Sequence, residues 1–252
     1  IELAHREYHA SMEEDSGANL KDSMHSVEGS EKLDKVNYER LRHHMTHSIW
    51  HADLHLAEIV KLKGSFFKNM GFVRSGVMYL YPEEVQHLAE LQQVYLERDG
   101  QVLDREGLYS LVLESMPHAC YLAYLKLKNL KYIVVRHSSE LRSFTCDGDV
   151  YDYLVAHPSS TLLEALVCFN IHAYDAKLFK RNLPETTPTS YVVVMSGLNM
   201  LSPRIMLKLL EEARGVPVMF AIMLPSGNIV FEEFTDATVS LNWKTDTFKL
   251  AS

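Results

Sequence analysis

Two short, mostly apolar runs rich in β-forming residues, 72–74 and 77–81, have a Ser-Gly pair at 75–76 between them. Runs of β-forming residues on either side of such a pair predict a β-hairpin. Pro82 follows at once, and two glutamates occupy 83–84. Proline lacks the amide hydrogen that a first helical turn leaves unpaired, and acidic side chains suit the positive end of a helix. The pattern predicts a hairpin that leads straight into a helix.

Upstream of this unit, helix-forming residues dominate from 31 to about 49, and apolar side chains recur there with a period of about 3.6 residues. Residues 1–30 are rich in acidic residues, serine and glycine. They have little apolar periodicity, so burial there cannot offset the entropy of the chain. We expect a disordered acidic arm followed by a helix.

Downstream, apolar runs flank Asp99-Gly100, a pair that accepts the positive φ of a tight turn, so a second hairpin is predicted. Asp104 suits the cap of a following helix that ends before Pro117. A further helix is predicted from His118 to about Asn129, and then a strand over 132–136.

Residues 137–160 are polar, with Ser-Ser, Asp-Gly-Asp and Pro-Ser-Ser clusters, and a linker is expected there. The predicted organisation is therefore the arm over 1–30, an N-terminal helix and hairpin domain over 31–136, the linker, and a C-terminal domain over 161–252.

The C-terminal part holds two apolar runs, 191–196 and 216–224, with the character of buried strands. Ser202-Pro203 and Gly215 mark the start and the end of a helix between them. Strand, helix and strand imply a parallel pair joined by a right-handed crossover, and a turn returns the chain as an antiparallel strand over 229–234. The predicted fold class is α/β of the α+β kind, ending in a compact mixed sheet.

The chain has 252 residues, of which 47% are hydrophobic, enough for one large or two small cores. No apolar run reaches the roughly 18 residues of a membrane span, so a soluble chain without a membrane partner is expected. The three cysteines have no metal or redox spacing, which favours a reducing compartment. A net charge of −8 argues against extensive phosphate binding. Because the chain begins at Ile1, we expect a piece of a longer protein.

A series of motifs occurs in one order: Trp50, Lys63-Gly64, Met70-Gly71-Phe72 and Tyr79-Leu80-Tyr81-Pro82-Glu83-Glu84. The series resembles the signature of the large non-catalytic subunit of eukaryotic tRNA-splicing endonuclease. The segment 121–136 is similar to the end of the family's N-terminal part, although Asn129-Leu130-Lys131 lacks the usual turn glycine. The region after it resembles the nuclease-like domain shared by these subunits, which has a restriction-endonuclease-like fold. The resemblance covers about Trp50 to Phe234.

The resemblance implies a nuclear heterotetramer in which this chain pairs with other subunits, including a catalytic one, and helps to hold pre-tRNA. No cofactor is implied. Catalytic subunits use a Tyr as base, then a His as acid, then a Lys near the developing charge. All 13 histidines lie at or before His172, residues 187–190 read Thr-Pro-Thr-Ser, and the Lys position falls near Arg214-Gly215. We therefore expect no catalysis by this chain.

Two alternatives remain open. One is an active RNA endonuclease with a rearranged set, Tyr153, His172 and Lys177. The other is a metal-binding interaction module, because histidines recur every four residues and histidines four apart on a helix can share a metal. This stripe consists of His43, His47, His51 and His55. No HExxH pattern accompanies it, and a polar or subunit-facing flank that binds no metal is the simpler interpretation.

Two basic clusters stand out against the acidic chain and suit contacts with RNA phosphates, or else form a solvated face. They are Lys61, Lys63, Lys68 and Arg74, and Lys126, Lys128, Lys131 and Arg136. The last two strands are apolar on both faces, which requires cover on each side, from a partner or from the domain itself. Since terminal strands form the subunit contact in the family, the expected interface residues are Phe220, Ile222, Ile229, Phe231, Glu232, Glu233 and Phe234.

Overall fold

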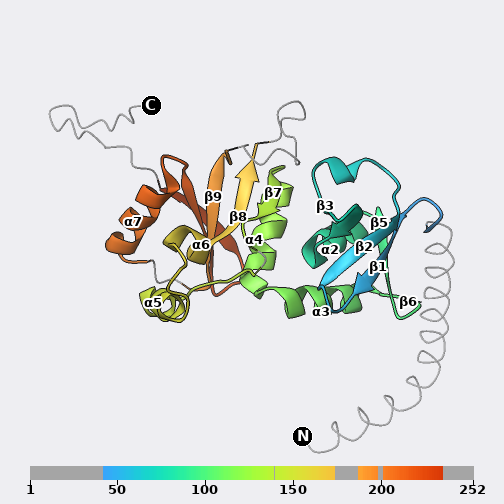
Figure 1. Cartoon of the computed structure of the whole chain (residues 1–252), viewed down its shortest axis with the longest axis horizontal. Helices are drawn as coiled ribbons and strands as arrows, with labels where there is room; N and C mark the ends of the chain where they lie inside the picture. Colours follow the sequence, from blue (N-terminus) through green and yellow to red (C-terminus); the bar gives the residue numbers. More distant parts are fainter. Residues whose placement is uncertain (1–41, 139, 174–186, 198–200, 235–252) are drawn as a thin grey trace, which may run out of the picture.

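The computed structural model describes residues 42–138, 140–173, 187–197 and 201–234, which form two α/β units side by side (Figure 1). Each unit has its own mixed sheet, so the predicted α+β fold class is confirmed. None of the helices in these ranges is long and apolar enough to cross a membrane.

The first unit is a six-stranded sheet in the order β3-β4-β2-β1-β5-β6. Its pairs are antiparallel apart from β1 with β5. Side chains of α2, α3 and one sheet face form a core that includes Trp50, Leu80 and Leu96. Its elements are β1 (Thr46–His51), β2 (Leu56–Lys61), η1 (Phe66–Lys68), β3 (Phe72–Arg74), β4 (Val77–Leu80), α2 (Pro82–Glu90), β5 (Val94–Arg98), β6 (Gln101–Val102) and α3 (Arg105–Ser115).

The second unit is a five-stranded sheet in the order β11-β10-β9-β8-β7. Helix α4 contributes to the core on one face, and α5, α6 and α7 contribute to the core on the other. Its elements are α4 (His118–Asn129), β7 (Ile133–Arg136), α5 (Asp147–Ala156), α6 (Leu162–Leu166), β8 (Val167–His172), β9 (Ser190–Met195), α7 (Pro203–Ala213), β10 (Val218–Met223) and β11 (Ile229–Phe234).

The predicted turns and helix starts are confirmed. Ser75-Gly76 and Asp99-Gly100 have positive φ at both positions, as a tight hairpin turn between twisted strands requires. Pro82 begins α2, and the carboxylate of Asp104 accepts a hydrogen bond from the Gly107 amide at 2.8 Å at the start of α3. The strand, helix and strand of the C-terminal part form the parallel pair β9 and β10, and β11 returns antiparallel.

Residues 46–49 do not continue the predicted helix over 31–49, and this part of the prediction is wrong. They begin β1, in which Thr46, Ser48 and Trp50 are buried and the residues between them are half-buried. The strand is hydrogen-bonded to β2 on one side and to β5 on the other, so the two-residue period of a sheet decides its structure. The arm over 1–30 and residues 31–41 lie outside the described residues.

The polar segment expected to be a linker, residues 137–160, holds helix α5. Three of its apolar residues are buried, although Tyr151 and Val155 are exposed: Leu141 packs into one core of the second unit, and Phe144 and Val150 pack into the other. Helix α4 and strand β7 also belong to the second sheet, although the sequence placed them in the N-terminal domain. These three buried side chains are enough to anchor the segment to both cores of the second unit.

His87 links the two units, since its ring on α2 meets the ring of Tyr124 on α4 edge-on at 6.2 Å. Burial, and then the charge of Lys128, lower the pKa of His87 below 6.5. Below pH 6.5 the unfolded chain therefore binds a proton that the folded chain does not, and stability falls as the pH drops through this value. Burial also lowers the pKa of His172.

We expect the melting temperature to fall between pH 7.5 and pH 5.5, and to fall less in His87→Gln, which cannot titrate. Thermal melts of both proteins across this range, with the exposed His157→Gln as control, measure the difference. An equal slope in wild type and His87→Gln would show that this histidine is not responsible.

Candidate nucleic-acid interface between the two units

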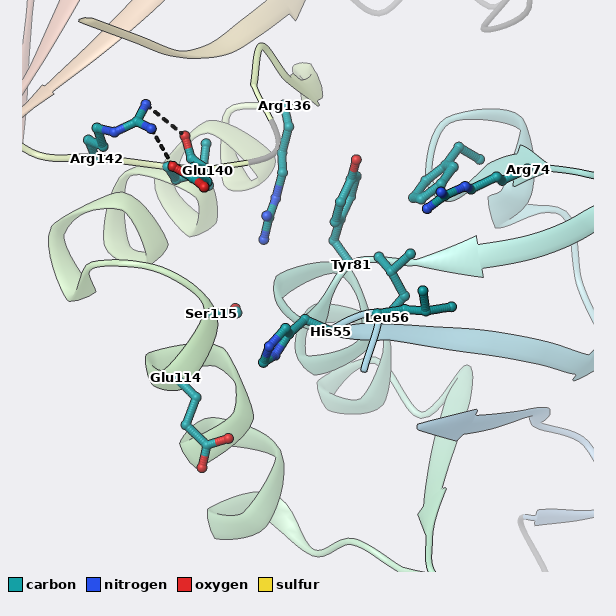
Figure 2. Close-up of a pocket in the computed structure, with 12 residues that line it drawn as sticks. His55, Leu56, Arg74, Tyr81, Glu114, Ser115, Arg136, Glu140 and Arg142 are labelled. Atoms are coloured by element: carbon teal, nitrogen blue, oxygen red, sulfur yellow. Dashed lines mark hydrogen bonds and ion pairs between the residues drawn. The ribbon is translucent and has the colours of Figure 1, made fainter. Parts of the chain in front are cut away.

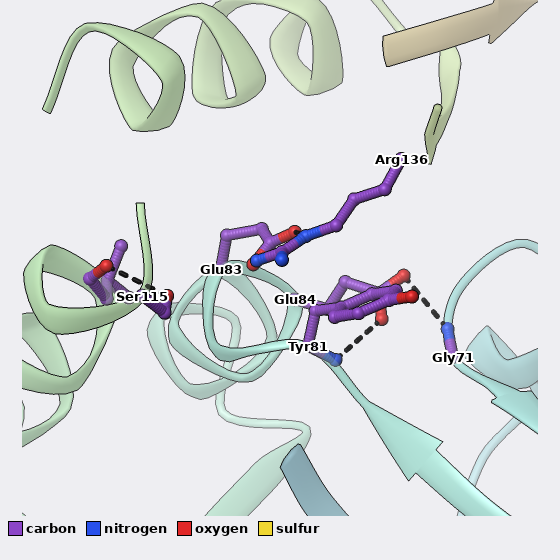
Figure 3. Close-up of polar contacts among 7 residues, drawn as sticks. Gly71, Tyr81, Glu83, Glu84, Ser115 and Arg136 are labelled. Carbon is purple, nitrogen blue, oxygen red and sulfur yellow. Dashed lines mark hydrogen bonds and ion pairs between the residues drawn. The ribbon is translucent and has the colours of Figure 1, made fainter. Parts of the chain in front are cut away.

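A buried ion pair joins the two units. Arg136, the last residue of β7, donates from Nε and Nη2 to the two carboxylate oxygens of Glu83 on α2, at 2.7 and 2.6 Å (Figure 3). The side chains of Arg136 and Glu83 are only 6% and 1% exposed. Burial alone would lower the pKa of Arg136, but the Glu83 carboxylate offsets it and the pKa is raised. The guanidinium also lies 4.2 Å from the centre of the Tyr81 ring.

Glu84, the next residue of α2, makes its hydrogen bonds within the first unit. Its carboxylate accepts hydrogen bonds from the amides of Gly71 at 2.9 Å and Tyr81 at 3.0 Å (Figure 3). The two glutamates of the Tyr79–Glu84 motif therefore have different tasks. Glu84 holds the entry to β3 against the helix start, and Glu83 holds the second unit.

A cavity of about 680 Å³ lies beside this ion pair, between the two units (Figure 2). Arg74 approaches it from β3 in the first unit, while Arg136 and Arg142 come from the second. Its other lining residues are Leu54, His55, Leu56, Phe72, Tyr81, Glu114, Ser115, Glu140 and Leu141.

The guanidinium groups at the cavity are held to different degrees. Arg136 is paired with Glu83, as described above. Arg142 lies 4.3 Å from the centre of the Tyr153 ring and donates to the Glu140 carboxylate at 2.5 Å. Arg74 is exposed, and the described contacts give it no partner. Three planar donors at one concave surface suit an anion with several oxygens.

Two of the eight predicted RNA-binding residues, Arg74 and Arg136, therefore meet at this cavity although they come from different sequence clusters. Lys61, Lys63 and Lys68 lie on the β2 to η1 segment of the first unit, where Lys61 and Lys68 are exposed and Lys63 is half-buried. Lys126 instead contacts β11: it donates to the Ile229 carbonyl, and its ammonium lies 5.7 Å from the Phe231 ring centre. Lys128 and Lys131 lie at the end of α4, and the charges of both lower the pKa of His87.

Arg142 was missed in the sequence because it stands in the polar segment expected to be a linker. The signal that was present is the hydrophobic residue Leu141 before it and Phe144 soon after, both of which are buried.

The predicted interface residues divide into two groups. Phe220 and Ile229 are buried in the chain's own cores, and the Phe220 ring meets the Phe234 ring at 5.1 Å. Glu232 and Glu233 are exposed on β11, which forms one edge of the described sheet, and Ile222, Phe231 and Phe234 are half-buried.

A second cavity, of about 540 Å³, lies where β9 begins and α7 ends. It is lined by Thr161, Leu163, Thr187, Tyr191, Glu212, Ala213, Arg214 and Val216. These include the two places at which the family resemblance puts the catalytic His and Lys, here Thr187 and Arg214. His137 contacts one of the lining residues: its ring is edge-on to Tyr191 at 5.7 Å, and its Nδ1 lies 2.9 Å from Asn170 Oδ1. His137 does not line the cavity.

The alternative sites are not assembled. Tyr153 stacks on His157 at 4.2 Å on α5, while His172 ends β8 at the opposite end of the sheet (Figure 1), and Lys177 lies outside the described residues. His47 and His51 are on strand β1 and each meets a glutamate, Glu97 or Glu58. His43 and His55 are in turns. In the described ranges, no group of three His, Cys, Asp or Glu side chains is arranged to hold a metal ion.

Comparison with protein families confirms the resemblance seen in the motifs. Residues 33–97 match the family model described as tRNA-splicing endonuclease subunit sen54 N-term, a match that runs through the strands β1 to β5 and helix α2. No curated protein matches the chain. The class of protein to which this segment is similar is therefore the tRNA-splicing endonuclease subunits. More closely, residues 33–97 are similar to the N-terminal domain of the Sen54-type subunit.

Proposed function

We propose that this subunit does not cut RNA itself but pairs with a catalytic subunit in the nucleus and helps to hold pre-tRNA while the intron is removed. The observation that carries the proposal is the second cavity. At the places where the family's acid and cation are expected, it has Thr187 and Arg214, and none of the histidines that the structure describes lines it. Without a group that titrates near neutrality, proton transfer to the leaving oxygen has no donor there.

The pairing part of the proposal rests on β11. An edge strand has a row of backbone donors and acceptors that another strand can use, and a chain that remains monomeric usually protects this edge. The exposed Glu232 and Glu233 give the edge a negative charge that selects for a basic partner surface. We expect the tagged chain to co-purify with a catalytic subunit of the endonuclease, and its recovery without any other subunit would rule out this part.

One observation favours a rival function. Tyr191 lines the second cavity with Arg214, and His137 lies against the Tyr191 ring, so a phenol, a cation and an imidazole occur near one another. This set would make the chain an active endonuclease with unusual spacing.

Three variants of this chain, each assembled with wild-type partner subunits, distinguish the two functions. Removing a group that acts in the transition state typically costs about 100-fold or more in rate. We expect Tyr191→Phe, His137→Gln and Arg214→Ala each to keep pre-tRNA cleavage within about twofold of wild type. The matched control is the corresponding Tyr or His substitution in the catalytic subunit, which should abolish cleavage at one splice site. If His137→Gln or Tyr191→Phe abolished cleavage at a splice site, the chain would be a nuclease.

A further inference from the structure

We infer that Cys120 and Cys168 form a reversible disulfide when the protein meets a peroxide, and that this oxidation loosens the segment 140–146 beside the cavity between the two units. The two residues are 48 positions apart in the sequence, Cys120 on α4 and Cys168 on β8. Folding places their sulfur atoms 3.9 Å apart in one core of the second unit. Both are free thiols. This inference does not depend on the proposed function.

Both thiols are hydrogen-bonded to the same backbone group, the carbonyl oxygen of Arg142. The Cys168 thiol donates to it at 2.8 Å, and the Cys120 sulfur lies 3.3 Å from it. This carbonyl belongs to the segment 140–146, the first part of which lines the cavity between the two units. The thiol pair is therefore joined to the cavity lining through one hydrogen-bond acceptor.

The oxidation balances with hydrogen peroxide as the oxidant. Cys168, as a thiolate, attacks one peroxide oxygen, the O–O bond breaks, and the hydroxide that leaves takes up the proton that Cys168 lost. The thiol of Cys120 then attacks the sulfenic sulfur, the S–O bond breaks, and water leaves as the disulfide forms. Two thiols and one peroxide thus give one disulfide and two waters. The hydrogen bond from Cys120 lowers the pKa of Cys168 in spite of burial, so Cys168 reacts first.

The way in which the chain is held above the thiols gives the peroxide a route. The amide of His137 donates to the Cys168 carbonyl at 2.9 Å, and the amide of Phe144 donates to the Val194 carbonyl at 3.3 Å. Among the described residues between these two points, Leu141 is the buried one. Local opening of a stretch with so few buried contacts uncovers the sulfur atoms without unfolding the second unit. A molecule as small as peroxide then reaches them.

Oxidation changes what the Arg142 carbonyl can bond to. A disulfide has no S–H group, so this carbonyl loses both thiols as donors. A carbonyl that loses its donors in the interior is destabilising, and the segment 140–146 moves to give the oxygen access to water. The cross-link between α4 and β8 restricts the unfolded chain at the same time and stabilises the second unit. The oxidised protein is therefore more stable as a whole but looser at this one segment.

Peroxide treatment of the full chain, well below its melting temperature, tests the inference. We expect two of the three thiols to disappear, a non-reducing digest to contain one peptide pair that joins Cys120 to Cys168, and dithiothreitol to restore both thiols. The half-buried Cys146 provides the matched control: Cys146→Ser should form the disulfide as wild type does, whereas Cys168→Ser should not. Circular dichroism before and after treatment verifies that the protein stays folded.

The peptide map is made on wild type, so its result stands even where a serine variant does not fold. A disulfide that includes Cys146, oxidation of Cys168 to a sulfinic acid without a disulfide, or two thiols that stay unreacted would each overturn the inference.

Limited digestion with trypsin tests the change at the segment, because the bond that trypsin cuts after Arg142 contains the carbonyl in question. We expect cleavage after Arg142 to be several-fold faster in the oxidised protein than in the reduced protein, and the melting temperature to be several degrees higher. Cleavage after Arg74, which precedes an exposed turn of the first unit, is the control and should be equal in the two forms. Equal cleavage after Arg142, or a lower melting temperature after oxidation, would show that the disulfide does not act on this segment as inferred.

Discussion

Glu83→Ala is expected to lower the free energy of unfolding by about 3–5 kcal/mol, because it leaves the Arg136 charge buried without its partner. Both side chains are almost completely buried, and their two hydrogen bonds join α2 to β7. The Arg136 side chain is only 6% exposed, so water can replace little of what the lost carboxylate supplied. Chemical denaturation of the full chain, followed by circular dichroism, measures the change.

Two further proteins make the result specific. Glu90→Ala removes another α2 glutamate, which accepts a hydrogen bond from Gln86 at 3.1 Å and lies 3.9 Å from the exposed Arg105, so its cost should be about 1 kcal/mol. The double variant Glu83→Leu with Arg136→Met leaves no charge unpaired and should recover most of the loss. If Glu83→Ala cost no more than Glu90→Ala, the ion pair would not hold the two units together.

Gly71→Ala is expected to destabilise the protein by about 3 kcal/mol, for two separate reasons. Gly71 has φ +73°, a conformation that costs a residue with a Cβ roughly 1–2 kcal/mol. A Cβ at this position would also lie 2.6 Å from the Phe67 ring and 2.8 Å from the carbonyl oxygen of Tyr79. The second contact is with backbone, which cannot move without disturbing the hairpin and the Gly71 hydrogen bond to Glu84.

Gly76→Ala is the matched control, since Gly76 has φ +82° but open space where the Cβ would be. It should show the backbone cost alone, about 1 kcal/mol. The difference between the two unfolding free energies therefore measures the close packing at Gly71. Equal losses in the two variants would mean that Gly71 is required only for its positive φ and not for close packing around it.

The local elements of this protein were largely predictable. Both hairpin turns, the start of α2 at Pro82 and the crossover from β9 to β10 follow from short-range patterns. These features depend on φ preferences and helix capping within a few residues, which any sequence displays directly. The helix predicted through residue 49 failed because β1 gains hydrogen bonds from two other strands, and no local pattern reveals those partners.

The candidate site was only partly predictable. Arg74 and Arg136 were recognised as basic, but each was assigned to its own cluster, and Arg142 was not recognised at all. Lys126 has the same sequence signal as its neighbours, yet its ammonium contacts β11. A sequence shows which residues are basic. It does not show which basic residues from different elements will line the same cavity.

The sequence by itself determined the family signature, the local hairpins and helices, and the lack of any histidine after His172. Each of these is a property of residue identity and near spacing. Only the tertiary structure decided that Glu83 meets Arg136, 53 positions away, and that the two units enclose a cavity of about 680 Å³. The reason is that an ion pair between distant residues is strong only where folding removes both from water, and burial of this kind is set by the packing of whole units.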